Sequence, residues 1–165
     1  MSVIFTPTPT AIVRAYQAGG LDANGQVPEQ QVSDGDGNPC RHCLRMIPMG
    51  AAMLVLAHRP FPSLQPYAEL GPIFLCAEAC EAGGGAAVPE VLTSPNYILR
   101  GYGPDDRIVY GTGAVVAVDR IVAEAQARLA DVRVAYVHVR SARNNCFQVR
   151  VDRQINRSPF ASSAT

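Results

Sequence analysis

The sequence contains no lysine, so all fourteen of its basic residues are arginines, and fourteen acidic residues balance them. Nucleic-acid-binding proteins usually carry an excess of basic residues, because the neutralisation of phosphates supplies much of their affinity. The balanced charge therefore argues against a nucleic-acid partner. Alanine, glycine, proline and valine are abundant, so we attribute the missing lysines to a compositional bias and give them no functional weight.

Long apolar runs are absent as well. No segment approaches the ~20 apolar residues that a membrane-spanning helix requires, which argues against a membrane partner. The first ten residues, "MSVIFTPTPT", lack the basic segment and long apolar core of a secretory signal. These absences predict a cytoplasmic protein. In that compartment the five cysteines are expected to be free thiols or metal ligands rather than disulfides.

A chain of 165 residues is long enough for one domain with its own core. We expect a single globular domain over residues 1–155, with a long polar loop at 19–39 and a flexible tail at 156–165. Two helices are predicted, at 9–18 with Thr8 or Thr10 as the cap, and at 119–130 with Asp119 as the cap.

Apolar runs and alternating segments predict many short strands. With few helices and short connections late in the chain, they favour an α+β fold: a mixed or antiparallel sheet with two or three short helices. The predicted strands cover residues 3–6, 51–58, 71–76, 97–102, 107–111, 115–116, 132–139 and 145–152.

Four of the five cysteines form two closely spaced pairs. Two residues separate Cys40 from Cys43, and three separate Cys76 from Cys80. A C-x-x-C turn directs two thiolates to one side, and structural zinc is commonly held by four such ligands. The two pairs are therefore a candidate zinc site. The alternatives are buried free thiols that act as small apolar residues, and a redox pair, which needs a βαβ context that is not evident here.

The surroundings of these pairs resemble a treble-clef zinc finger, in which a knuckle supplies two ligands and the start of a helix supplies two more. The resemblance rests on Ile47 and Gly50 after the first pair and on Phe74 before the second. It implies that Cys76 ends a strand and that Cys80 lies in the first turn of a helix. The long separation of the two pairs departs from that pattern.

Two histidines lie near these segments. His42 is inside the first C-x-x-C turn and is expected to face solvent. His58 ends the predicted strand over 51–58 and is expected to be a hydrogen-bonded strand terminus rather than a ligand.

The last two predicted strands show the clearest alternation. Ala135, Val137 and Val139 alternate with polar residues in the first, as Phe147, Val149 and Val151 do in the second, and side chains of a strand alternate between its faces. A hairpin must turn both apolar faces to the core, so the polar side chains gather on the opposite face. We predict a register that opposes Arg140 with Cys146 and His138 with Gln148. This polar face then holds His138, Arg140, Cys146, Gln148 and Arg150, with Asn145 in the adjoining loop.

This polar face is the candidate functional surface. Cys146 and His138 are the candidate catalytic residues, because a histidine beside a thiol can activate it as a nucleophile. Guanidinium groups hold carboxylates and phosphates through charge-assisted hydrogen bonds, which indicates a small anionic ligand. The alternative is a solvated polar face with no further role. The candidate ligand-binding residues are Arg140, Arg150, Gln148 and Asn145.

Several segments resemble a bacterial family catalogued as domain of unknown function 1203. The most specific is "YVHVR" followed by a cysteine within the next six residues. Because the family has no assigned function, the resemblance implies a bacterial single-domain protein and little chemistry. The resemblance covers about residues 38–153 and rests on "PCRHCL", "PYAELGPIF", "CAEACE", "YILRGY" and "VAYVHVRSARNNCFQVRVDR".

The leading hypothesis is a small α+β protein that binds a small anionic molecule at the face of His138, Arg140 and Arg150, with accessory zinc at the four cysteines. One alternative is an enzyme that uses Cys146 with His138 for acyl or thiol chemistry. The other is a zinc-organised interaction module with no small ligand.

Overall fold

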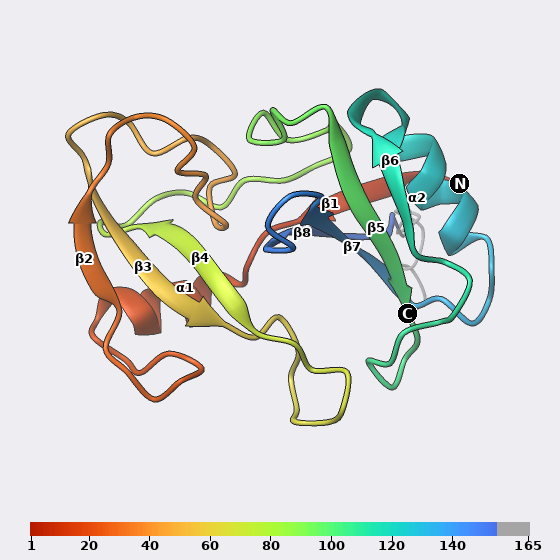
Figure 1. Cartoon of the computed structure of the whole chain (residues 1–165), viewed down its shortest axis with the longest axis horizontal. Helices are drawn as coiled ribbons and strands as arrows, with labels where there is room; N and C mark the ends of the chain where they lie inside the picture. Colours follow the sequence, from red (N-terminus) through yellow and green to blue (C-terminus); the bar gives the residue numbers. More distant parts are fainter. Residues whose placement is uncertain (155–165) are drawn as a thin grey trace, which may run out of the picture.

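The fold combines two antiparallel sheets with two helices, as a computed structural model of residues 1–154 shows. The sheets lie side by side, and each has one helix packed on it (Figure 1). The predicted α+β class is confirmed. The tail predicted at 156–165 lies outside the described residues. Within residues 1–154, neither helix has the length and apolar character that crossing a membrane requires.

The larger sheet contains five strands in the order β1-β8-β7-β5-β6. The helix α2 (Ile121–Leu129) covers one face of it, with Ala125 buried against the central valines. The first and last segments of the described chain pair here, so the N-terminal strand closes one edge of the sheet. The strands are β1 (Val3–Thr6), β5 (Asn96–Tyr102), β6 (Ala114–Ala117), β7 (Tyr136–Ser141) and β8 (Phe147–Arg153).

The smaller sheet has the order β2-β3-β4. The helix α1 (Thr10–Gln17) packs on it through Val13 and Tyr16, in a second core that includes Cys40 and Ile47. The predicted loop over 19–39 supplies strand β2, whose pairing with β3 depends on a distant segment that its polar composition does not reveal. The strands are β2 (Glu29–Val32), β3 (Ala52–His58) and β4 (Gly71–Cys76).

The predicted helix caps are wrong. α1 begins after Pro9 with no side-chain cap, and the hydroxyl of Thr10 lies 2.9 Å from His42 Nε2 instead. Asp119 lies within a 3₁₀ turn, Val118–Arg120, that leads into α2. The predicted strand at 107–111 is limited to a single bridge between Ile108 and Tyr102.

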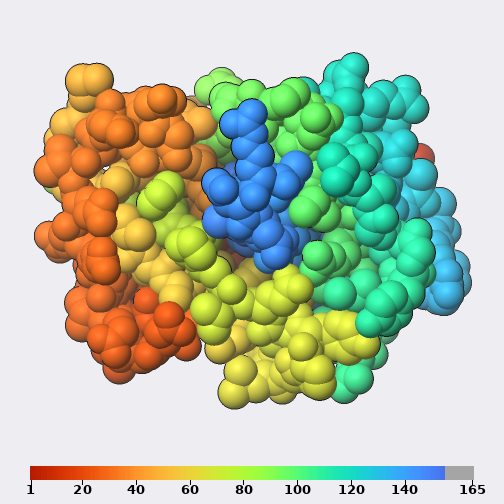
Figure 2. Space-filling view, viewed as in Figure 1, coloured from red at the N-terminus to blue at the C-terminus, as the bar shows by residue number. Residues whose placement is uncertain are grey.

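The connection between β3 and β4, residues 59–70, crosses to the larger sheet and covers the face opposite α2. Phe61 packs on Tyr102 with ring centroids 5.2 Å apart. The carboxylate of Glu69 lies 2.9 Å from Arg100 and 3.1 Å from Arg140. In Figure 2 this segment, in yellow, lies against the green and blue parts of the larger sheet. Both faces of β7 are therefore buried, which the alternation of its sequence did not indicate.

Candidate metal centre and neighbouring pocket

The first cysteine pair lies on a knuckle before β3. Cys40 N donates to Arg45 O (3.0 Å), and Leu44 N donates to Cys40 O (3.0 Å). Leu44 has a φ of 55°, in the left-handed region that non-glycine residues rarely adopt. These bonds bend the chain tightly enough for Cys40 and Cys43 to direct their sulfurs to one side.

The second pair comes from the end of β4. Cys76 is the last residue of that strand, and Ala77 N donates to Ala52 O at 3.1 Å. Residues 77–80 form an irregular loop that carries Cys80 back over the knuckle. The helix that the treble-clef resemblance implied at Cys80 is therefore absent from this part of the chain, because the loop turns back instead of continuing as a helix.

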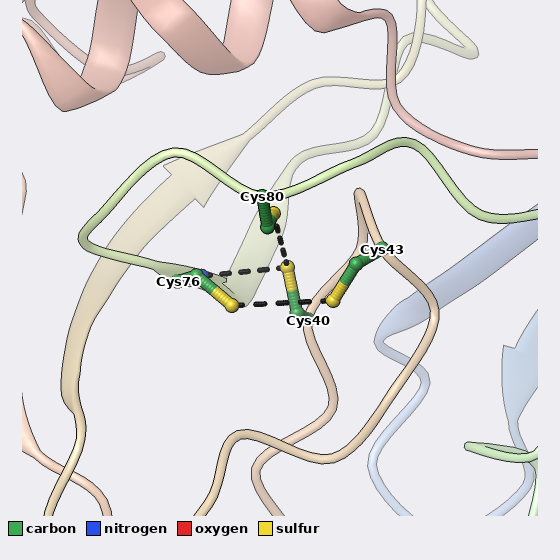
Figure 3. Close-up of side chains that lie close together, drawn as sticks. All are labelled: Cys40, Cys43, Cys76 and Cys80. Atoms are coloured by element: carbon green, nitrogen blue, oxygen red, sulfur yellow. Dashed lines mark hydrogen bonds between the residues drawn. The ribbon is translucent and has the colours of Figure 1, made fainter.

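The four sulfurs converge, as Figure 3 shows. All lie within 4.8 Å of one another. The Cys40 and Cys80 sulfurs are 4.0 Å apart, and those of Cys43 and Cys76 are 3.9 Å apart. A tetrahedral ion with Zn–S bonds of about 2.3 Å holds its sulfurs about 3.8 Å apart. The four cysteines are thus placed as if to hold one metal ion.

The charges of the cluster also favour a cation. Hydrogen bonds from the Cys43 and Cys76 side chains lower the pKa of Cys40 far below its usual value. Burial and the negative charge of Cys40 raise the pKa of Cys80 to about 12. One thiolate therefore suppresses ionisation of its neighbours, and only a bound cation allows all four to ionise together.

One backbone nitrogen and one imidazole nitrogen lie close to sulfurs of the cluster. Cys76 N donates to Cys40 Sγ at 3.3 Å. His42 Nδ1 lies 3.2 Å from Cys80 Sγ, and the residue is fully buried. The prediction that His42 faces solvent is wrong, because the knuckle turns this side chain inward beneath α1.

The last hairpin has the predicted facing but a different register. Val137, Val139, Val149 and Val151 are all fully buried in the core beneath α2, as their alternation predicted. His138, however, opposes Arg150.

A bulge between Val139 and Arg140 shifts the pairing, so Arg140 opposes Phe147. Ser141 N donates to Cys146 O (2.9 Å), and Asn145 has a φ of 57°. Cys146, which the predicted register paired with Arg140, therefore belongs to the turn.

The bulge separates the two candidate catalytic residues. Cys146 and Gln148 line a hollow beside Arg41 and Tyr97, while His138 lines a different pocket. The Cys146 thiol lies 3.5 Å from Asn144 O, and no hydrogen bond joins it to His138. The predicted grouping of Cys146 and Gln148 with His138 is therefore wrong.

Arg140 is committed to internal contacts. It donates to Asn145 Oδ1 (3.0 Å) and Asn145 O (2.7 Å) and pairs with Glu69. Both residues, predicted to bind a ligand, are thus occupied in fixing the turn of the hairpin. Of the predicted ligand-binding residues, Arg150 alone lines the pocket of His138.

A pocket of about 400 Å³ lies between the two sheets. The connection from β1 to α1 forms one wall, residues 58–62 form a second, and side chains of β7 and β8 form the rest. Its surface is mainly apolar, with Ile12, Phe61 and Phe147 among the lining residues. This size and character suit a small organic molecule.

His138 lies deep in this pocket. The residue is 1% exposed. The centroid of its ring lies 4.8 Å from the ring centroids of Tyr102 and Phe147 and 5.2 Å from that of Phe61. Burial, reinforced by the charge of Arg140, lowers its pKa well below the usual value. Burial also lowers the pKa of His58, on the same pocket, to about 4. Both imidazoles are therefore neutral at pH 7.

His58 was expected to be a hydrogen-bonded strand end, and its Nδ1 lies 3.5 Å from the hydroxyl of Tyr16. Its place on the pocket, together with that of Arg59, was not foreseen. Both follow directly after the apolar run of β3, where a strand end next to prolines was the only available signal.

Five buried side-chain nitrogen or oxygen atoms in residues 1–154 have no hydrogen-bond partner. Two, on Glu69 and Arg140, belong to one ion pair. The other three are Thr8 Oγ1, Arg59 Nε and His138 Nδ1, and all three residues line the pocket between the sheets. Unpartnered buried polar groups are rare in folded proteins and each calls for an explanation.

Substitution of His138 by leucine is expected to leave stability at pH 7 within about 1 kcal/mol, because it removes a polar group without a partner at Nδ1. Unfolded histidine takes up a proton near pH 6.5, and the folded imidazole does not, so acid destabilises the native protein. H138L should therefore lose less stability than wild type as the pH falls below about 6.5. Urea unfolding across this range measures the difference. A large loss of stability in H138L at pH 7 would show that the imidazole of His138 stabilises the folded protein.

No curated protein and no solved structure matches the chain. Residues 37–153 match a protein family described as Protein of unknown function (DUF1203). The match begins just before the cysteine knuckle and ends with β8, so it includes the four cysteines and His138. The chain therefore belongs to the DUF1203 family.

Proposed function

We propose that this protein binds a small anionic molecule with an apolar body in the pocket between its two sheets, and that zinc at the four cysteines braces the wall of that pocket. The main support is that three buried polar atoms without a hydrogen-bond partner, on Thr8, Arg59 and His138, belong to residues that line one pocket. A ligand that hydrogen-bonds to these side chains would account for them.

The charged groups of the pocket favour an anion. Arg150 is already paired with Asp152 at 2.7 Å and stacks over Tyr136, 3.9 Å from its ring centroid. The guanidinium of Arg59 is in no ion pair of the described chain, and Arg59 lines the pocket too. With His58 and His138 neutral, Arg59 leaves one positive charge in excess at the pocket, and a carboxylate or phosphate would balance it.

The apolar lining of the pocket favours a ligand whose remaining part is apolar. Ile12, Phe61 and Phe147 stand on different walls, together with prolines of residues 7–9 and 60–62. Burial of an apolar body among them would contribute roughly 25 cal/mol per Å². The neutral imidazole of His138 would orient the ligand by a single hydrogen bond.

Zinc is the metal that this cluster suits best. Four sulfurs and no oxygen ligand select a soft ion, and a separation near 4 Å suits one ion held tetrahedrally. The loop that carries Cys80 is hydrogen-bonded to α1 through Arg14, and Ile12 of the same helix lines the pocket. Purified protein is expected to contain one zinc per chain by elemental analysis, and a metal-free, fully folded protein would refute this part.

Substitution of Arg59 by methionine tests the anion site. Benzoate serves as the probe and benzamide as its neutral match, each titrated while the amide resonances of the pocket are followed by NMR. A charge-assisted hydrogen bond contributes about 1.5–3 kcal/mol, so benzoate should bind at least about tenfold more tightly than benzamide. R59M should remove this difference.

The matched control is R120M, which removes an exposed arginine beside α2, outside the pocket. It should bind benzoate as wild type does. Equal binding of benzoate and benzamide to wild type would overturn the anionic character of the ligand. No response of the pocket to millimolar concentrations of either probe would overturn the site.

A further inference from the structure

His42 bridges the metal cluster and helix α1. Its Nδ1 lies 3.2 Å from Cys80 Sγ, and its Nε2 lies 2.9 Å from the hydroxyl of Thr10. A metal-bound thiolate has no proton and only accepts hydrogen bonds, so Nδ1 must carry the hydrogen. In the neutral ring Nε2 is then an acceptor, and the Thr10 hydroxyl donates to it.

We propose that His42 is a positioning residue of the metal centre: it donates to the Cys80 thiolate and fastens helix α1 to the metal-binding loop. The inference rests on the zinc site proposed above. Metal-bound side chains are commonly oriented by such hydrogen bonds from neighbouring groups, and loss of one costs about 10- to 100-fold in metal affinity.

Two further residues of α1 donate hydrogen bonds to residues 76–80, the loop that carries Cys80. Arg14 Nη2 donates to Cys80 O at 2.8 Å. Gln17 Nε2 donates to Cys76 O at 2.9 Å and to Glu78 O at 2.8 Å. One turn after another, α1 thus holds both ends of the loop that carries the second cysteine pair. Thr10, Arg14 and Gln17 share one face of the helix. Arg14 and Gln17 contact the loop directly, and Thr10 contacts His42, which lies 3.2 Å from Cys80 Sγ, so all of these contacts depend on where the metal holds the cysteines.

The arrangement links the two sites of the protein. Pro9 and Ile12, at the start of α1, line the pocket between the sheets. The same turn carries Thr10, whose hydroxyl contacts His42. Zinc that fixes the loop therefore also fixes this wall of the pocket.

The experiment compares zinc affinity and amide exchange in three His42 variants. H42A lacks the donor and should raise the zinc dissociation constant at least about tenfold, measured by competition with a chromophoric chelator. The asparagine amide nitrogen reaches the position of Nδ1, so H42N should retain near wild-type affinity. The glutamine amide reaches the position of Nε2, so H42Q should resemble H42A. If the His42 side chain only filled space, H42N and H42Q would have similar zinc dissociation constants.

Hydrogen exchange of the α1 amides is the second readout. Zinc should slow their exchange in wild type and H42N and slow it much less in H42A. T10V removes the hydroxyl that holds the ring, and it should speed α1 exchange in the zinc-loaded protein. T10S is its matched control, because it keeps the hydroxyl that contacts His42 and removes only the methyl group.

Equal zinc affinity of H42A, H42N and wild type would overturn the inference. If H42A fails to fold, the comparison of T10V with T10S is the deciding test, and equal α1 exchange in these two variants would overturn the inference. A wild-type protein that binds no zinc would instead refute the metal centre itself, so the two failures are distinguishable.

Discussion

Replacement of Cys40 by serine is expected to remove the bound zinc and to lower the melting temperature by about 10 °C or more. Cys40 is fully buried, and its sulfur contacts both Cys80 Sγ and Cys76 N. Metal at a thousandfold excess over its dissociation constant stabilises the native state by about 4 kcal/mol. In a chain of this size each kcal/mol shifts the melting temperature by roughly 2–4 °C. Calorimetry with zinc analysis measures both changes.

The matched control for C40S is C146S. Cys146 lies outside the cluster and is half-buried, so its serine variant should keep both its zinc and its melting temperature. A strong chelator should lower the melting temperature of wild type and C146S to about that of C40S, and it should leave C40S itself unchanged. Equal melting temperatures of C40S and C146S would contradict a stabilising metal centre.

Substitution of Glu69 by glutamine is expected to destabilise the protein by about 2–3 kcal/mol. Its carboxylate contacts Arg100 and Arg140, whose side chains are 19% and 5% exposed. Removal of one partner from a buried ion pair costs about 3–5 kcal/mol, because the other charge stays buried. The expected loss is smaller here, since the Glu69 side chain is 37% exposed and water can reach it. Urea unfolding at neutral pH gives the value.

D105N is the control for E69Q. Asp105 forms an ion pair with Arg107 at 4.0 Å, and both side chains are more than half exposed. Exposed pairs contribute little, so D105N should change stability by less than about 0.5 kcal/mol. Losses of similar size in the two variants would show that the connection over residues 59–70 does not hold β5 and β7 as the structure indicates.

Much of the fold could be read from local patterns. The apolar runs at 51–58 and 71–76 become β3 and β4 because side chains of that kind need burial wherever they lie. The alternation of valines in the last hairpin correctly assigned its core face, since a slip of one residue would expose every valine. The pairs Cys40/Cys43 and Cys76/Cys80 were likewise recognisable from spacing, and they do converge.

Other features depended on contacts between distant segments. Strand β2 exists because β3 pairs with it, although its own sequence reads as a loop. The register of the last hairpin includes a bulge between Val139 and Arg140, and that arginine pairs with Glu69 from the distant connection between β3 and β4. No local pattern encodes such a contact.

By itself, the sequence determined the α+β class, the valine-lined core and the four candidate metal ligands, because each follows from periodicity or spacing along a short segment. Only the tertiary structure decided that His138 is buried and lines a pocket together with Arg59 rather than lying beside Cys146, and that His42 joins the cysteines to α1. These arrangements arise where the two sheets and the segments between them pack together. A side chain's partners there come from parts of the chain tens of residues away.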